Sequence, residues 1–233
     1  MTEVEKMAKA SGRRMSAPRC GRPPLDRAGE VEARILDAAT KVFLERGFEG
    51  ASVDLIAETA RSGKPTIYAR FQNKEALFAA AIAHRIALKN ARVSSHKVTG
   101  ETIEARLAGI AVTLVNETLT DEFVGLFRLC MAESRRFPEL VRSLVGMARR
   151  RGGEVIAQLL AGVSECGMLG AAPGDCDERL ARAARYFIDL ILAPVLLRAL
   201  AGEACETLRA EFADDADRRV AFFLAACRHG GVA

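Results

Sequence analysis

The chain has 233 residues, which is enough for one large domain or two smaller ones of about 100 to 200 residues each. Half of the residues are hydrophobic and 27% are charged, a balance that excludes a chain that is disordered throughout. The net charge of +4 is uneven, since residues 1–95 carry 17 Lys and Arg against 11 Asp and Glu, whereas residues 96–233 carry 17 against 19. The positive half of the chain is therefore the N-terminal one.

The longest apolar run, residues 186–200, is shorter than a bilayer span and contains Asp189, Pro194 and Arg198. It predicts a buried or interfacial helix, and we expect no membrane partner. The first residues are charged and lack the apolar stretch of a secretory signal, and the six cysteines show no CxxC spacing. These features predict a protein of the reducing cytoplasm.

Residues 1–28 are rich in Lys, Arg, Ser, Gly and Pro without a sustained period, which predicts a flexible arm. The arm is basic, with seven Lys and Arg in the first 29 residues. Basic arms commonly run along nucleic-acid phosphates, although a tail that only aids solubility would have the same composition. The segment Gly-Arg-Pro-Pro, residues 21–24, is similar to the core of minor-groove hooks, so we expect Arg22 to enter the minor groove of DNA.

Hydrophobic periodicity predicts helices along the rest of the chain, and strand-like alternation is absent. The first helix ends at Gly47, which can take a left-handed conformation and let Phe48 fold back onto Phe43. Ser52 and Asn73 are each placed to cap the helix that follows. We therefore expect an all-α fold, with helices at about residues 30–47, 53–60, 64–71, 74–94, 103–119, 122–136, 138–165, 177–200 and 214–228.

The second and third of these helices are short and are joined by a tight turn, which is the pattern of a helix-turn-helix unit. The second helix of such a unit enters the major groove of DNA, and here Ile67 and Phe71 are expected to pack inward. The outward residues offer donors for phosphates and base edges, and a methyl group for thymine. They are Lys64, Pro65, Thr66, Tyr68 and Arg70. The alternative is an ordinary helical hairpin with a solvated face.

A longer pattern covers residues 33–82, where apolar, small and capping residues follow one another at fixed spacings. Its members are Ile35, Ala38, Ala39, Phe43, Gly47, Phe48, Ser52, Ile56, Ala57, Ala60, Thr66, Ile67, Tyr68, Phe71, Lys74, Glu75 and Leu77. The pattern resembles the DNA-binding domain of tetracycline-repressor-type (TetR) transcriptional regulators. This resemblance implies a sequence-specific transcriptional regulator whose partner is a double-stranded DNA operator. We expect it to be a repressor.

The resemblance also implies a role for individual residues. Backbone phosphates would be bound by Ser52, Tyr68 and Lys74. Bases would be approached by Lys64, Pro65 and Thr66. The role of Lys74 agrees with its position at a helix N-terminus, where free backbone amides already favour an anion.

The turn of the motif departs from the family pattern. Family members usually have Gly-Val-Ser there, whereas this chain has Arg61, Ser62 and Gly63, and so lacks the turn glycine, an apolar plug and the capping hydroxyl. Arg61 either adds a phosphate contact or stays solvated in a weaker turn, and the sequence leaves both readings open.

The stretch LFRLCMAESRRFPELVRSL, residues 126–144, resembles the ligand-binding and dimerisation domain of a TetR subgroup. This implies two tasks for the C-terminal part, which are to pair subunits and to sense an unidentified small molecule. We expect three segments, namely the arm at 1–28, the helix-turn-helix DNA-binding domain at 29–75 and a larger helical effector-binding and dimerisation domain at 76–233.

Pairing is predicted for the last two helices. The segment 186–200 is apolar nearly all round, and the last helix places apolar residues on one face, so the two could form a four-helix bundle with their copies in a homodimer. The residues of that face are Val220, Phe223, Leu224 and Cys227. Two recognition helices could then reach successive major grooves about 34 Å apart. The alternative is that both helices belong to the core of a monomer.

A soft apolar and aromatic set is the candidate for ligand binding. Its members are Phe123, Phe127, Met131, Leu159, Tyr186 and Phe187, each of which could instead be part of the core. By the resemblance, a ligand that favours mis-spaced recognition helices would release DNA.

An enzyme, or a helical small-molecule-binding module without DNA affinity, is the competing interpretation. The partial motifs for catalysis are incomplete, and the isolated histidines and scattered cysteines lack metal-ligand spacing. The acidic cluster of Asp214, Asp215 and Asp217 is expected to cap and charge the start of the last helix. We therefore predict no catalytic residues, no cofactor and no metal.

Overall fold

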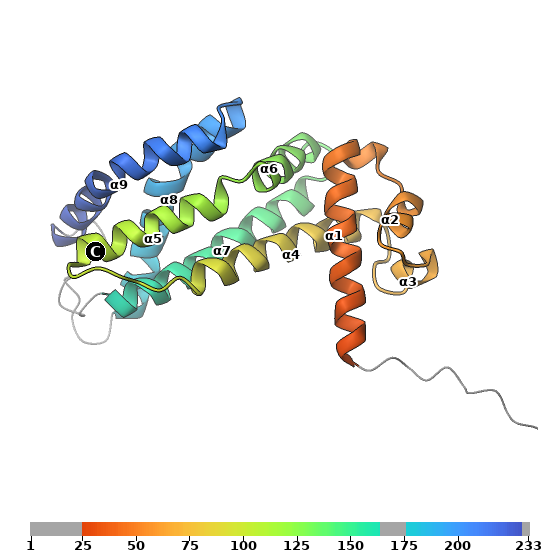
Figure 1. Ribbon diagram of the computed structural model, residues 1–233, viewed down its shortest axis with the longest axis horizontal. Coiled ribbons are helices and arrows are strands. Elements are labelled where there is room, and N and C mark those ends of the chain that lie inside the picture. Colours follow the sequence, from red (N-terminus) through yellow and green to blue (C-terminus); the bar gives the residue numbers. More distant parts are fainter. Residues whose placement is uncertain (1–24, 164–175, 230–233) are drawn as a thin grey trace, which may run out of the picture.

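The computed structural model describes residues 25–163 and 176–229, and within those residues every regular element is a helix (Figure 1). The all-α prediction is confirmed. The helices are α1 (Leu25–Gly50), α2 (Val53–Thr59), α3 (Lys64–Tyr68), α4 (Lys74–Ser94), α5 (Ile103–Thr118), α6 (Asp121–Glu133), α7 (Pro138–Val163), α8 (Cys176–Ala201) and α9 (Cys205–Arg228).

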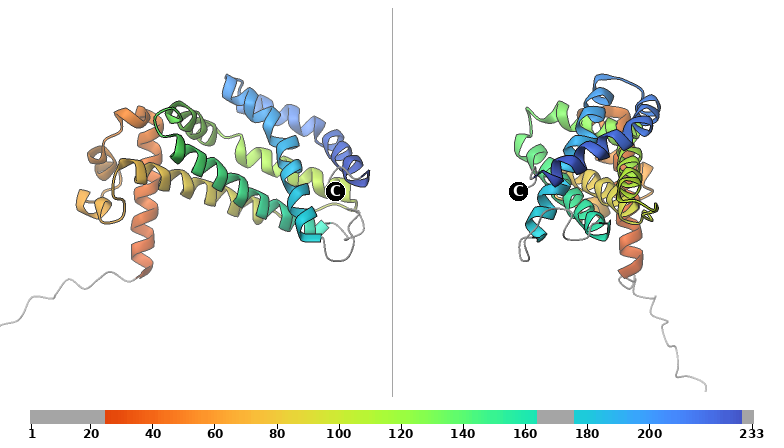
Figure 2. Two further views of the ribbon diagram at one scale, coloured as in Figure 1. Left: turned by 180° about the vertical axis from the view of Figure 1, so that it is seen from behind. Right: turned by 90° about the vertical axis from the view of Figure 1, so that its left-hand side faces the viewer.

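The helices pack around two hydrophobic clusters. The first contains residues of α1, α2, α3, α4 and α6 and of the start of α7. Its centre includes the completely buried Phe43 and Phe78. The second joins α5, α8 and α9 with the end of α7, and includes Ile110 and Phe187. The views in Figures 1 and 2 show α1, α2 and α3 at one end of the molecule and α5, α8 and α9 towards the other, with α4 and α7 extending between them. The long helices α4 and α7 therefore link the two clusters.

Local signals fix the helix ends that the sequence predicted. Gly47 interrupts the helical backbone of α1 with a φ of 71°, three residues before the element ends at Gly50, and the ring of Phe48 stacks on that of Phe43 with centroids 5.9 Å apart. The hydroxyl of Ser52 accepts a hydrogen bond from the backbone N–H of Leu55, and the side chain of Asn73 accepts one from Ala76. These caps set where α2 and α4 begin, and so fix α3 between them.

The expected start of the last helix was wrong. α9 begins at Cys205 rather than near residue 214, so Asp214 and Asp217 lie exposed in its middle, and Asp215 pairs with Arg219 one turn later at 2.9 Å. The physical reason is that an apolar stripe already runs from Cys205 through the buried Leu208 and packs the helix onto the second cluster. Acidic residues on its solvent face resemble an N-terminal cluster without ending the helix.

α1 begins at Leu25, so its first residues fall within the expected arm, and the rest of that arm lies outside the described residues. Within the described ranges, no helix has the length and apolar character needed to cross a membrane. The same ranges contain no group of three or more His, Cys, Asp or Glu side chains arranged for a metal ion.

Candidate nucleic-acid interface and ligand pocket

The short helix α3 has one buried side and one side that is exposed to solvent. Ile67 is 1% exposed and Phe71 just after the helix is 7% exposed, so both anchor α3 in the first hydrophobic cluster. On the outer side Tyr68 is 51% exposed and Lys64 and Pro65 are exposed, while Thr66 is half-buried. The predicted division into inward and outward residues therefore matches the geometry of α3.

The turn before α3 holds Arg61 in a left-handed conformation, with a φ of 48°. The N–H of Arg61 donates to the carbonyl of Glu58 at 3.0 Å and that of Ser62 donates to Ala57 at 2.9 Å, which is the bonding of a Schellman motif. Glycine is the usual residue at the left-handed position because it has no Cβ. The chain thus has an exposed arginine at a position that favours glycine.

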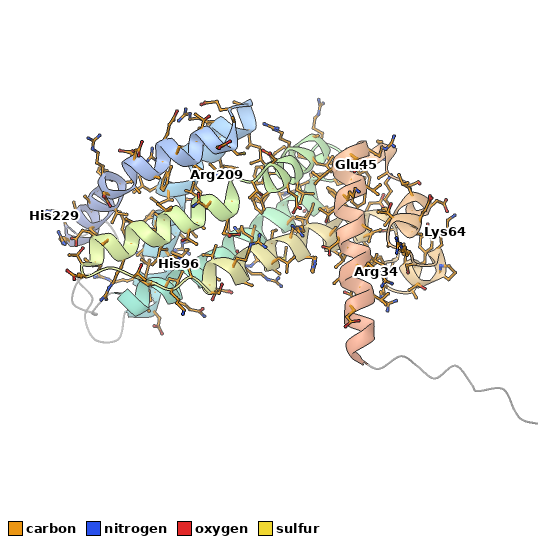
Figure 3. All side chains as sticks on the ribbon, in the orientation of Figure 1. Arg34, Glu45, Lys64, His96, Arg209 and His229 are labelled. Carbon is orange, nitrogen blue, oxygen red and sulfur yellow. The ribbon has the colours of Figure 1, made fainter. Side chains whose placement is uncertain are left out.

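A residue that the sequence reasoning missed helps to hold this turn. Arg34 in α1 donates from Nε to the carbonyl oxygen of Ala60 at 2.9 Å, and so satisfies a carbonyl at the C-terminal end of α2. Figure 3 shows Arg34 and Lys64 at the same end of the molecule. The position of Arg34 one turn before the buried Ala38 gave no sequence signal, because its partner is a backbone carbonyl 26 residues away.

The predicted phosphate ligands lie around α3. Ser52 is exposed, and because its oxygen accepts the cap bond, its hydroxyl hydrogen remains able to donate to a phosphate. The ammonium of Lys74 donates to the carbonyl of Glu49 at 3.2 Å and lies 4.6 Å from the ring centre of Phe48. Lys74 is therefore held beside the N-terminus of α4, the place where the free amides favour an anion.

Lys64 and Arg70 have local partners in the free chain. Lys64 forms an ion pair with Asp54 of α2, and Arg70 turns back so that Nη1 donates to the carbonyl of Thr66 at 3.1 Å. Both side chains of the Lys64–Asp54 pair are about half or more exposed, and such pairs contribute little, about 0–1 kcal/mol. A phosphate or base can therefore compete for Lys64. Arg22 lies outside the described residues.

The predicted ligand set is divided among three places in the structure. Phe123 and Phe127 of α6 line an apolar pocket between α4, α6 and α7. Phe187 is completely buried in the second cluster, where its ring meets that of Phe223 edge-on at 5.1 Å. The prediction of one site was wrong for the other members, because Leu159 packs on the second cluster and the side chains of Met131 and Tyr186 are exposed.

The pocket wall is almost entirely uncharged. Its other members are Ile82, Ile86, Leu126, Cys130, Leu144, Val145, Ala148 and Arg85. Burial raises the pKa of the Cys130 thiol to about 12, so this group stays neutral and behaves as a small apolar side chain. Arg85 is the exception, and its guanidinium is paired with Asp37 of α1 at 3.5 Å and with Glu122 of α6.

The expected pairing face needs a correction as well. Val220, Phe223, Leu224 and Cys227 of α9 are buried in the second cluster of the single chain, so they do not form an outer face. The large apolar side chains that α8 and α9 expose are different ones, namely Tyr186, Leu197 and Phe222, with Leu197 69% and Phe222 67% exposed.

Two family models match the chain. "Bacterial regulatory proteins, tetR family" matches residues 35–81, and "AefR-like transcriptional repressor, C-terminal domain" matches residues 105–228, which is more than half of the chain. The chain belongs to the TetR family. It is a transcriptional regulator with a helix-turn-helix DNA-binding domain, and the matched proteins are regulators rather than enzymes, as predicted.

Individual relatives agree with this assignment. ComR of Escherichia coli (strain K12), a transcriptional repressor, is 32% identical over 96 residues, 40% of this chain and 46% of ComR. FasR of Mycolicibacterium smegmatis, a transcriptional activator, is 35% identical over 57 residues, 24% of this chain and 26% of FasR. The regulator thus aligns with less than half the length of these curated relatives. A TetR-family crystal structure from Mesorhizobium loti has 25% identity and a TM-score of 0.66, and the match covers 86% of this chain and 98% of that one.

Proposed function

We propose that this regulator is a homodimeric repressor that binds a near-palindromic DNA operator and releases it when a small molecule occupies the pocket between α4, α6 and α7. Residues 29–75 would bind DNA, and residues 76–233 would bind the effector and pair the subunits. The observation that carries the proposal is the geometry of α3, which buries Ile67 and Phe71 and presents Lys64, Pro65 and Tyr68 to solvent.

The DNA contacts follow from this geometry. Ser52, Tyr68 and Lys74 bind phosphates on either side of the groove, and Lys64, Pro65 and Thr66 approach base edges. The exposed guanidinium of Arg61, held out by the left-handed turn, adds a phosphate contact beside them. Arg22 of the arm enters the neighbouring minor groove.

The homodimer is supported by the exposed apolar residues of α8 and α9. Tyr186, Leu197 and Phe222 are large side chains that a single chain leaves in water, and burying them against a second copy removes that cost. Two recognition helices held about 34 Å apart then contact successive major grooves of one operator. Repression rather than activation is supported by the description of the C-terminal family model and by the name of ComR, whereas FasR shows that a related DNA-binding domain also serves an activator.

Ligand control is supported by the short connection between the pocket and the DNA-binding end. α6 lies against α1, and a Cβ atom added at Gly125 would be only 2.9 Å from Cδ2 of Leu44. A ligand that displaces α6 would therefore press on the helix that supports α2 and α3. Tenfold release of DNA requires about 1.4 kcal/mol of differential binding between the two conformations.

The decisive experiment is selection of bound DNA from random duplexes with the full chain, followed by anisotropy titrations of the selected operator at several salt concentrations. We expect a near-palindromic site, a steep salt dependence and a dimer by light scattering. Binding of no sequence above random DNA at low salt would refute the regulator's proposed operator and favour a ligand-binding module without DNA affinity.

A further inference from the structure

Lys89 of α4 is a charged residue in a buried position. It follows the buried Ile86 by three residues and precedes the buried Val93 by four, so it belongs to the inward stripe of the helix, and it is only 6% exposed. Among the described residues it has no hydrogen-bond or ion-pair partner, and its ammonium lies 5.1 Å from the ring centre of Phe123. Burial lowers the pKa of Lys89 to about 8, with nearby Glu117 acting in the opposite direction. At pH 7 most molecules therefore carry a positive charge here, on an ammonium that lines an open pocket and has no ion-pair partner among these residues.

The cations around Lys89 have ion-pair partners, whereas Lys89 has none within the described ranges. It faces a second, open pocket. In the wall of this pocket Arg85 is paired with Glu122 and Arg92 is paired with Glu117. Arg85 is also paired with Asp37 of α1, so Lys89 is the cation of this wall that has no ion-pair partner in the described part of the chain. A bound anion would give Lys89 the partner that it lacks.

A second donor points to the same kind of ligand. Thr120 lines this pocket, and its oxygen accepts the capping hydrogen bond from the N–H of Phe123 at 3.2 Å. Its hydroxyl hydrogen is therefore able to donate to an acceptor such as a carboxylate oxygen. Thr120 is the N-cap of α6, whose first turn already carries Asp121 and Glu122, so the Thr120 hydroxyl and not the helix end is the second donor to the ligand.

The charged pocket adjoins the apolar one. Phe123 and Arg85 belong to the walls of both, so the pocket lined by Lys89 and the apolar pocket lined by Ile82 and Leu126 are neighbours. A cationic end beside an uncharged cavity is complementary to a molecule with an anionic head and an apolar body.

We infer that the effector of this regulator is an amphipathic monocarboxylate, whose carboxylate is bound by Lys89 and Thr120 and whose hydrocarbon part occupies the apolar pocket beyond Phe123. This inference rests on the proposed role of the C-terminal domain as a ligand sensor. It adds the chemical class of the ligand and the residue that recognises it.

The test is calorimetric titration of the full chain, without DNA, with straight-chain carboxylates from hexanoate to decanoate and with the alcohols of the same lengths. We expect at least one carboxylate to bind at pH 7 at least tenfold more tightly than its alcohol, because only the carboxylate neutralises Lys89. Lys89→Met should weaken carboxylate binding about 10- to 100-fold and leave alcohol binding nearly unchanged. Lys89→Arg should retain most of the affinity, and the matched control Lys97→Met, which changes an exposed lysine just beyond α4, should behave as the parent chain.

Two results would overturn the inference, namely that no carboxylate of the series binds, or that Lys89→Met binds them as the parent does. Measuring whether the compounds release the selected operator separates a failure of this inference from a failure of the proposed function. If carboxylates bind through Lys89 but leave the operator bound, the ligand class stands and the ligand-responsive repression fails. If another class of compound releases the operator while the carboxylates do not bind, the repression stands and the monocarboxylate is wrong.

Discussion

Replacing Lys89 by Met should make the free protein more stable. The ordinary lysine pKa of 10.5 falls to about 8 in the fold, and this difference corresponds to about 3 kcal/mol against the folded state when the group is charged in both states. Met has a similar length and no charge, so it fills the same space. It loses the contact between the ammonium and the ring of Phe123, worth about 1 kcal/mol. We therefore expect the free energy of unfolding to rise by about 2 kcal/mol at pH 7.

The same substitution should change the pH dependence of stability in a defined direction. Below pH 8 the amine is charged in the folded and unfolded states, and the burial cost is fully present. As the pH rises from about 8 to 10.5 the folded state loses this proton first, so the cost disappears and the parent chain gains on the variant. Arg85, Arg92, Glu117 and Glu122 face the same pocket, but they are present in both proteins and cancel in the comparison.

Urea unfolding of the parent chain and of Lys89→Met at pH 7, 8.5 and 10 measures both effects, with Lys97→Met as the exposed control. We expect the stability advantage of Lys89→Met to shrink by most of its value between pH 7 and pH 10, at an unchanged dependence on urea. A variant that is less stable than the parent at pH 7, or an advantage that does not change with pH, would refute the description of Lys89 as a buried and uncompensated cation.

Three further predictions concern the DNA-binding end and the pairing face. Arg61→Gly should raise the free energy of unfolding by about 1 kcal/mol in thermal or urea unfolding, because glycine relieves the left-handed turn; a loss of stability would show that the arginine side chain stabilises the turn. In anisotropy titrations, Tyr68→Phe and Lys74→Ala should weaken all DNA sequences alike, and Lys74→Ala should also flatten the salt dependence, whereas Thr66→Ala should change which sequence is preferred; the reverse pattern would contradict these roles. Leu197→Arg should convert the dimer to a monomer in light scattering without unfolding it, and an unchanged mass would place the interface elsewhere.

The DNA-binding end was predictable from sequence because its signals are local. Gly47, Ser52 and Asn73 each act on backbone groups within four residues, so the sequence states both the donor and the acceptor. The inward phase of Ile67 and Phe71 follows from helical spacing alone. The hydrogen bond of Arg34 could not be predicted in this way, because it depends on how α1 and α2 cross.

The C-terminal part was harder to predict because the apolar face of a helix does not show which other helix packs against it. Phe123 and Phe187 are both aromatic residues within predicted helices. Phe123 lines the pocket between α4, α6 and α7, whereas Phe187 packs on Phe223. Lys89 carried a signal that was missed. A lysine in phase with Ile86 and Val93 is a charge on the buried stripe of an amphipathic helix, and such a residue indicates a site even before its surroundings are known.

Arg85 links the ligand pocket to the DNA-binding end, so a ligand between α4 and α6 would affect the helix that supports α2 and α3. Its guanidinium is shared between Asp37 of α1 and Glu122 of α6, and it lies in the walls of both the apolar and the charged pocket. A bound carboxylate would attract Arg85 as well as Lys89 and so compete with Asp37 for the same cation. Because Asp37 belongs to the helix that packs on α2, the coupling requires a change in one ion pair and in the α1–α6 contact rather than a signal carried across the whole bundle.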